Sequence, residues 1–160
     1  MANYQYENSG AIVDVDNAVR VTFDLNPESF NDTKDTEFAS VAIPGMSHPK
    51  IQFTGGGERI LRFEIILHNG ATEDVPAAIR QLQGWLYPEY TNGRLTKAPS
   101  RLLVVFGDTW PDEQWVLRNC EITRDRFDKD LNCILAYANL ELVEYIDESI
   151  DAKAVRRWQN

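Results

Sequence analysis

Residues 41–67 decide the fold class: Val41-Ala-Ile-Pro-Gly-Met-Ser-His-Pro-Lys-Ile-Gln-Phe-Thr-Gly-Gly-Gly-Glu-Arg-Ile-Leu-Arg-Phe-Glu-Ile-Ile-Leu67. In its last part, apolar and polar residues alternate, which places Leu61, Phe63, Ile65 and Leu67 on one face, the period of a half-buried strand. Ile51–Thr54 has the same strand character. We interpret Gly55–Gly57 as a flexible turn that pairs the two runs as a hairpin.

The segment that precedes this hairpin, residues 28–50, is mostly polar and predicts a long connection. A loop of this length is uncommon in a compact domain unless it has a function or is ordered by a partner. Its centre is the apolar tetrapeptide Ile43-Pro44-Gly45-Met46. We therefore expect this segment to have a function or to be ordered by a partner.

Further strands are predicted on both sides of this region. Ala11–Val15 and Val19–Leu25 are expected to form two strands joined at Asp16-Asn17, and Arg101–Phe106, apolar on both faces, is typical of a central strand. The remaining strands are expected at Gln114–Thr123 and Asn132–Val143.

One long helix is predicted between Asp74 and Leu86. Thr72 or Asp74 suits its N-cap, Pro76 fits its first turn, and apolar residues recur at helical spacing until Pro88. The tail carries acidic residues first and basic residues last, which complements a helix dipole, so a short terminal helix capped by Ser149 is expected. The fold class is thus mainly β (α+β): an antiparallel domain over residues 1–146 with one flanking helix, followed by a tail, residues 147–160, with a short C-terminal helix.

The length, charge and composition of the chain limit the classes of function that it could have. A chain of 160 residues is most simply one domain, and its net charge of −9 repels DNA and anionic lipid, which argues against a general nucleic-acid binder. The start lacks a signal peptide, and no stretch approaches the roughly 18 apolar residues of a membrane span, so we expect a soluble, cytosolic protein. Cys120 and Cys133 are expected as free, mostly buried thiols.

The search for catalytic, cofactor and metal sites is negative. His48 and His68 lie in turn contexts, and no Lys-Ser/Thr pair follows Gly55–Gly57 as a phosphate-binding loop requires. We expect no catalytic residue, no cofactor and no metal. Trp110, in a turn, and Trp158, in the tail, are instead typical of aromatic residues that anchor an interface.

An ordered set of motifs resembles the N-terminal domain of contractile injection system tube and baseplate proteins. The set begins with the strand from Val19 that ends in Asn26-Pro27. The Ile-Pro-Gly loop, a Pro-x-hydrophobic-Gln-Phe strand, the glycine turn and a Leu-x-Phe-Glu strand follow in this order. After the helix come Ala98-Pro99, the strand end Phe106-Gly107 and the strand end Glu144-Tyr145. It covers residues 19–145. Two departures are the absence of a C-terminal LysM domain and the turn from Trp110 to Trp115.

The resemblance implies a structural protein with a tail-tube-like β-barrel or sandwich. It implies a six-fold ring at the junction of tail tube, spike hub and baseplate, with wedge proteins around it, in a virion tail assembled in the host cytoplasm. Six copies at −9 each would carry −54, and we expect part of this charge to line a lumen through which DNA passes without specific binding. Under this interpretation, Ile43, Pro44, Gly45 and Met46 are expected to contact a neighbouring subunit. In the tail, Arg156, Arg157 and Trp158 are expected to dock on a partner.

Two other classes stay open from the sequence alone. A small acidic module, of the immunity type that neutralises a basic protein partner, fits the net charge. An acid/base enzyme is the weaker alternative, because acidic clusters such as Asp125, Asp128 and Asp130 are more often solvated turn residues.

Overall fold

The computed structural model describes residues 8–68, 74–147 and 152–155. Its strands are β1 (Ala11–Asp14), β2 (Arg20–Thr22), β3 (Phe30–Val41), β4 (Lys50–His68), β5 (Glu89–Thr91), β6 (Arg94–Lys97), β7 (Arg101–Val105), β8 (Gln114–Phe127) and β9 (Cys133–Tyr145). Its helices are α1 (Val75–Gly84) and α2 (Ala152–Val155). Among the described residues, no helix has both the length and the apolar character needed to cross a bilayer.

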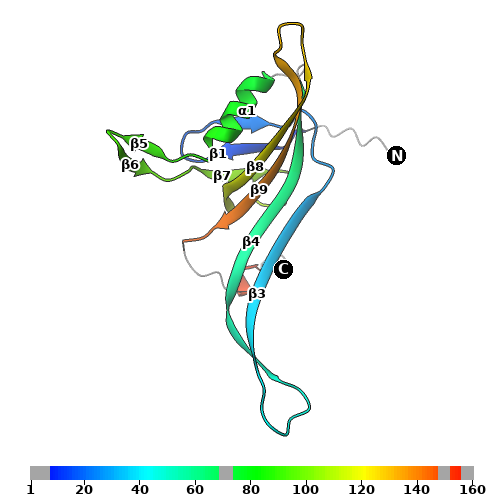
Figure 1. The fold of residues 1–160 in the computed structure, drawn as a ribbon, viewed down its shortest axis with the longest axis vertical. Coiled ribbons are helices and arrows are strands. Elements are labelled where there is room, and N and C mark those ends of the chain that lie inside the picture. The colour runs from blue at the N-terminus through cyan, green and yellow to red at the C-terminus, as the bar shows by residue number, and fades with distance from the viewer. Residues whose placement is uncertain (1–7, 69–73, 148–151, 156–160) are drawn as a thin grey trace.

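Seven strands form one antiparallel sheet in the order β2-β1-β7-β8-β9-β4-β3, while β5 and β6 form a separate hairpin (Figure 1). This confirms the mainly β, antiparallel fold with one flanking helix. β7 lies between β1 and β8, as its apolar sequence predicts. The short C-terminal helix is α2; Ser149, its expected cap, lies outside the described residues.

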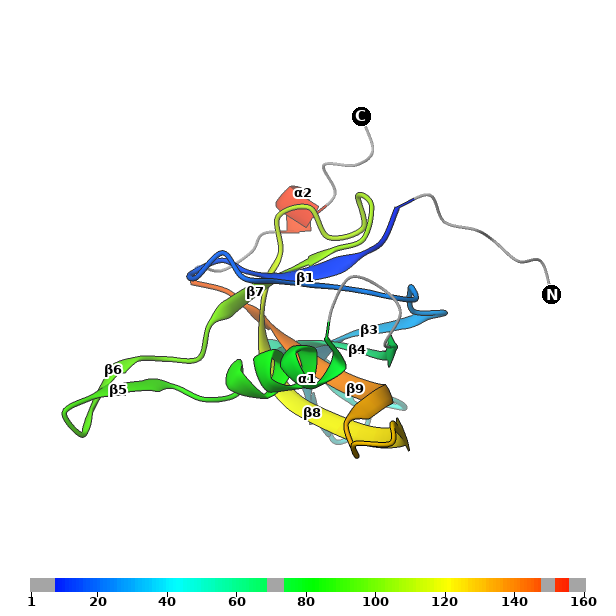
Figure 2. The same ribbon diagram turned by 90° about the horizontal axis from the view of Figure 1, so that it is seen from above.

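The long sheet curls so that its two parts face each other (Figure 2). After β2, Leu25 forms an isolated antiparallel bridge with Ile66 of β4, and the backbone N–H of His68 donates to the Asp24 carboxylate at 2.9 Å. No ladder joins β2 to β3 in the described part of the chain, so these strands form a sandwich-like fold and not a closed barrel.

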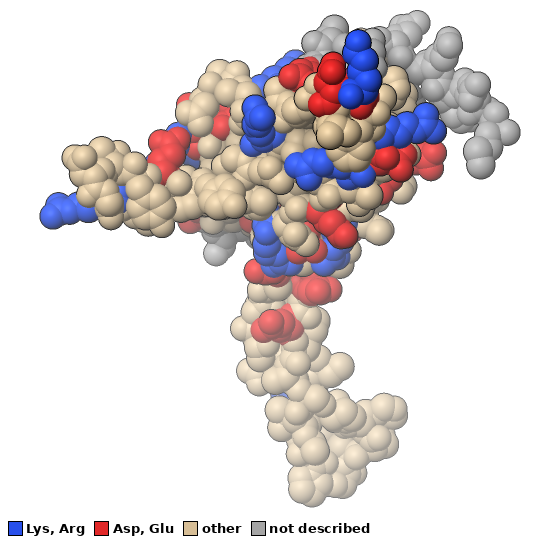
Figure 3. Space-filling view, turned by 45° about the horizontal axis from the view of Figure 1, so that its top comes forward, with Lys and Arg blue, Asp and Glu red and all other residues tan. Residues whose placement is uncertain are grey.

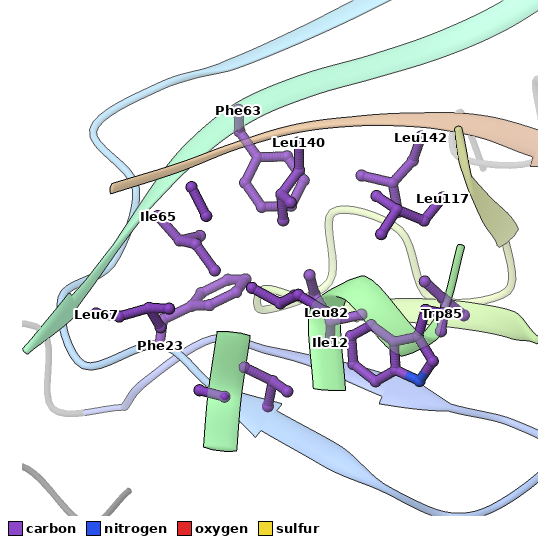
Figure 4. Packing of buried hydrophobic residues seen from close by; sticks show 14 of the residues in the cluster. Ile12, Phe23, Phe63, Ile65, Leu67, Leu82, Trp85, Leu117, Leu140 and Leu142 are labelled. Carbon is purple, nitrogen blue, oxygen red and sulfur yellow. The ribbon is translucent and has the colours of Figure 1, made fainter. Parts of the chain in front are cut away.

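The core lies between the two parts of the sheet and helix α1. The inward face of β4 presents Leu61, Phe63, Ile65 and Leu67, each at most 6% exposed, which confirms the predicted alternation. Figure 4 shows Phe23 and Leu82 meeting these side chains, with Leu140 and Leu142 contributed by β9.

Helix α1 follows the expected signals with small differences. Asp74 occupies the N-cap with extended backbone but makes no side-chain capping bond, and Thr72 lies outside the described residues. The helix ends at Gly84, before the expected Leu86. The next residue, Trp85, is buried, and its indole N–H donates to the Asp14 carboxylate at 3.1 Å, which ties the helix end to β1.

The predicted long loop is wrong. Most of residues 28–50 belongs to β3, which pairs antiparallel with β4 from Phe30↔Phe63 to Val41↔Lys50 and leaves only a short turn at the tip. The polar sequence of β3 concealed the strand because β3 is the sheet edge and its distal part stands clear of the core, so no apolar alternation is required.

The predicted turn at Gly55–Gly57 is also wrong, because the glycines lie inside the continuous strand β4. Here the pairing with β3 shifts register between Lys34 and Thr36, so that Asp35 of β3 faces two residues of β4, Gly57 and Glu58. A Cβ on Gly57 would approach the Cβ and carbonyl oxygen of Asp35 to 3.0 Å. The glycine therefore permits the close approach of two strands at a β-bulge.

The first hairpin is largely as predicted, since β1 and β2 pair across a turn that contains Asp16 and Asn17. Within the expected strand Val19–Leu25, Val21 and Phe23 are buried, but Val19 and Leu25 are exposed. Regular pairing with β1 is confined to Arg20–Thr22. Only two of the four residues on the expected apolar face are therefore buried in the core.

Candidate assembly surfaces

The distal part of the β3–β4 hairpin, residues 36–56, projects from the body and is called the β3–β4 arm (Figure 1). From Phe38 to Thr54 its sequence carries Lys50 as its one formally charged residue. Figure 3 shows the same contrast, with charged side chains gathered on the body and an almost uncharged arm. The large exposed apolar side chains of the arm are Phe38, Val41, Ile43, Met46, Ile51 and Phe53.

The tip of the arm is a β-turn built by its sequence. Met46 N–H donates to the carbonyl oxygen of Ile43 at 3.2 Å, and Gly45 has φ +86°. Proline at the second position and a positive-φ glycine at the third define a type II turn. The structure thus brings the four predicted contact residues together, and the side chains of Ile43 and Met46 are 40% and 57% exposed.

Two phenylalanines stiffen the middle of the arm. Phe38 and Phe53 are directly opposite in the register, and their rings meet edge-to-face with centroids 6.0 Å apart. They are nevertheless 59% and 62% exposed. Such a pair adds order to a two-stranded ribbon. A large apolar surface that stays in solvent is the mark of an interaction site.

At the base of the arm, Arg59 joins four segments of the chain. Its guanidinium donates to Asp32 of β3 at 2.7 and 2.9 Å and to Glu144 of β9 at 3.3 Å, with Glu113 at 3.7 Å. It also lies 5.3 Å from the ring centroid of Trp115. These contacts fix the arm where the sheet leaves the core.

The electrostatics of this cluster follow from its composition. The hydrogen bonds from Arg59 hold the pKa of Asp32 below its usual value, against the opposing effect of burial. The carboxylates in turn raise the pKa of Arg59, chiefly through the bond to Asp32. Both groups are therefore charged at neutral pH.

Trp110 lies beneath the same cluster. Its ring is 5% exposed, packs on Phe30 at 4.9 Å between centroids, and its indole N–H donates to Asp32 at 3.2 Å. In a single copy its surface is therefore covered by the chain itself, and the partner contact expected for it stays a prediction. Arg156, Arg157 and Trp158 lie outside the described residues.

A second projecting hairpin, β5–β6, was not anticipated. Asn92 and Gly93 both have positive φ, 51° and 75°, as the tight turn between paired strands requires. The exposed side chains on and beside this hairpin include Tyr87, Tyr90 and Leu95. An Asn-Gly pair between two short strands is the strongest short sequence signal for a hairpin.

The outer face of the β3–β4–β9–β8 region is polar and slightly hollowed. Its hollow of about 290 Å³ is lined by side chains that include Arg62, Glu64, Glu121 and Glu141. Glu141 accepts hydrogen bonds at 2.7 Å from Arg62 and Arg118 on the two neighbouring strands. The described residues contain no group of three or more His, Cys, Asp or Glu placed to hold a metal ion.

These features describe a small β domain that exposes six large apolar side chains on an arm outside its core, as in proteins that assemble with other subunits. The chain belongs to the contractile injection system tube protein family, whose family model matches residues 4–153. A comparison with curated proteins finds no match. The family makes the chain a structural component of a contractile injection system, part of an assembled multi-subunit particle.

Proposed function

We propose that the chain forms a six-fold ring at the junction of tail tube, spike hub and baseplate, in a contractile phage tail or a related injection particle. The observation that carries this proposal is the β3–β4 arm, which exposes six large apolar side chains and has its tip outside the core. The family supports a subunit of a tube particle.

The arm supplies the contact between copies. Burial of an exposed large apolar side chain is worth about 1.5–3 kcal/mol, so a few of those on the arm outweigh much of the cost of association. The near absence of charge removes the desolvation penalty that would oppose docking. Ile43, Pro44, Gly45 and Met46 at the tip are the residues that we expect to lie on a neighbouring subunit.

The edges of the sheet offer a second means of assembly. β3 and β2 are the terminal strands of the seven-stranded sheet, and β3 is 12 residues long. An edge of this length presents free backbone donors and acceptors that another strand can pair with. Pairing of edges around a ring would satisfy them.

The polar outer face of β4, β9 and β8 suits a lumen. Glu64 and Glu121 line its hollow, while Arg62 and Arg118 are paired with Glu141. Such a surface offers DNA no excess positive charge, so DNA would pass without specific binding. If Glu64→Lys with Glu121→Lys left DNA passage unchanged, this part of the proposal would fail.

The neighbours in this proposal are the tail tube protein above, the spike hub below and the baseplate wedge proteins around the ring. The chain would be located in the virion tail, after assembly in the host cytoplasm. The tail, residues 147–160, would dock on one of these neighbours through Arg156, Arg157 and Trp158.

The test replaces the tip Ile43–Met46 with Gly/Ser residues. We expect assembled particles, and any ring seen by light scattering and negative-stain imaging, to be lost while circular dichroism shows a folded monomer. Val15→Ser, at an exposed apolar residue of the β1–β2 turn, is the matched control and should assemble normally. A folded tip variant that assembles as well as the control would overturn the role of the arm.

A further inference from the structure

A groove lies at the turn end of the β8–β9 hairpin, beside helix α1. Its volume is about 230 Å³, and an apolar cavity of roughly 150 Å³ already holds a benzene-sized group. Phe127 and Leu131 at its edge are 50% and 82% exposed. Its lining includes Pro76, Ile79, Arg80, Arg124, Phe127 and Leu131.

The charge of the groove is opposite to that of the chain. Arg80 from α1 and Arg124 from β8 are both exposed, and neither forms an ion pair with another residue of the described ranges. The chain as a whole carries −9. The chemistry that fits the groove is an apolar side chain next to a carboxylate, because guanidinium groups bind carboxylates with directed hydrogen bonds.

The chain carries such a segment just beyond the end of β9. Ile146 is 46% exposed and is followed directly by the exposed Asp147. An apolar side chain of this size that the core leaves half in solvent gains from burial elsewhere.

One copy is not able to fill its own groove with this segment. At the groove, Cys133 at the start of β9 pairs with Phe127, whereas Tyr145 at the other end pairs with Gln114. Strand β9 has thirteen residues from Cys133 to Tyr145, a span of roughly 40 Å. The segment and the groove therefore lie at opposite ends of the same ladder (Figure 1).

We propose that the groove between α1 and the β8–β9 turn binds the Ile146–Asp147 segment of a second copy. Ile146 enters the hollow beside Phe127 and Leu131, and the Asp147 carboxylate accepts hydrogen bonds from Arg80 and Arg124. The contact joins unlike surfaces of identical chains, so it propagates from copy to copy. It uses neither the tip of the β3–β4 arm nor the edge of β3, and so adds a further contact between copies to those of the proposed ring.

The test traps the contact between two differently marked chains. A Leu131→Cys chain is mixed with an Ile146→Cys chain under mild oxidation, and disulfide-linked dimers are counted on non-reducing gels. We expect at least a several-fold higher yield than from the control pair Leu131→Cys with Tyr90→Cys. Tyr90 is 64% exposed, more than Ile146 at 46%, but it lies on the β5–β6 hairpin. The unmodified chain gives the background from Cys120 and Cys133. A yield equal to the control would overturn the proposal.

A charge exchange then tests the two ionic partners. Arg124→Glu in the Leu131→Cys chain should lower the yield several-fold, and Asp147→Arg in the Ile146→Cys chain should restore it. Loss without rescue would overturn the pairing of these groups. Adding Met46→Ser to both chains should leave the yield unchanged, so failure of the proposed role of the arm is distinguishable from failure of this contact.

Discussion

Arg59 of β4 and Asp32 of β3 form a bidentate ion pair, with nitrogen–oxygen distances of 2.7 and 2.9 Å. The pair lies where the hairpin leaves the core, with Trp110 donating to the same carboxylate at 3.2 Å. The side chains of Arg59 and Asp32 are 24% and 31% exposed. The core of the sheet ends at this contact and the β3–β4 arm begins.

Replacement of Arg59 by Met should destabilise the protein. The change leaves Asp32, Glu113 and Glu144 without their shared cation, and hydrogen bonds to charged groups are worth about 1.5–3 kcal/mol each. We expect the free energy of unfolding, measured by urea denaturation, to fall by about 2–4 kcal/mol.

The control for this change is Arg126→Met. Arg126 is 73% exposed, and its ion pair with Asp125 is long, at 3.9 Å. Its replacement should therefore alter the free energy of unfolding by less than about 0.5 kcal/mol. Equal losses in the two variants would show that the Arg59 cluster does not hold the base of the arm.

Acid should weaken the protein through Asp32. Because Arg59 lowers the pKa of this carboxyl below its ordinary 3.8, the stabilisation is complete above pH 3.8 and disappears as the pH falls through the lower pKa of the folded state. Glu141, with its pKa lowered by Arg62 and Arg118, acts in the same direction.

The measurement is the free energy of unfolding between pH 7 and pH 2. The unmodified chain should lose stability below about pH 4, whereas Asp32→Asn should start lower at pH 7 and lose less on acidification. The two curves should converge at the acid end. Parallel curves over the whole range would contradict a charged Asp32 in the folded state.

Both native cysteines should be slow to react. Burial raises the pKa of Cys120 to about 11, and Cys133 is buried at the start of β9. Because the thiolate is the reactive form, fewer than about one in a thousand Cys120 thiols is activated at pH 7.5. A chromogenic disulfide reagent should titrate both thiols only after denaturation, while Leu131→Cys adds one fast thiol. Rapid reaction of a native thiol would contradict this.

Sequence patterns predicted the parts of the fold that bury side chains on one face. The alternation in β4 from Leu61 to Leu67, the helical stripe of α1 and the free thiols are confirmed. In β4 and α1, the contact of one face with the core imposes a period on the sequence. The same reasoning failed on β3, because an edge strand that stands in solvent is under no such constraint.

The candidate site was identified in part for the same reason. The tetrapeptide Ile43–Met46 was noticeable because it is apolar within a polar segment, and the structure places it at the tip of the arm. Phe38 and Phe53 were not recognised, since their significance depends on the cross-strand register that pairs them. The groove with Arg80 and Arg124 joins residues from α1 and β8 that only the tertiary fold brings together.

Gly57 should be the least replaceable of the three consecutive glycines Gly55–Gly57 at the base of the arm. Its added Cβ would lie 3.0 Å from both the Cβ and the carbonyl oxygen of Asp35, and the backbone there is not free to retreat without breaking the bulge. We expect Gly57→Ala to cost about 1–3 kcal/mol of unfolding free energy, as overpacking does elsewhere. Gly55→Ala, whose Cβ would meet nothing within 4 Å, is the matched control and should be neutral or slightly stabilising.

If the bulge also sets the direction of the arm, Gly57→Ala should reduce assembly more than its loss of stability alone explains. Equal stability of the two variants would show that the strands separate freely at this point.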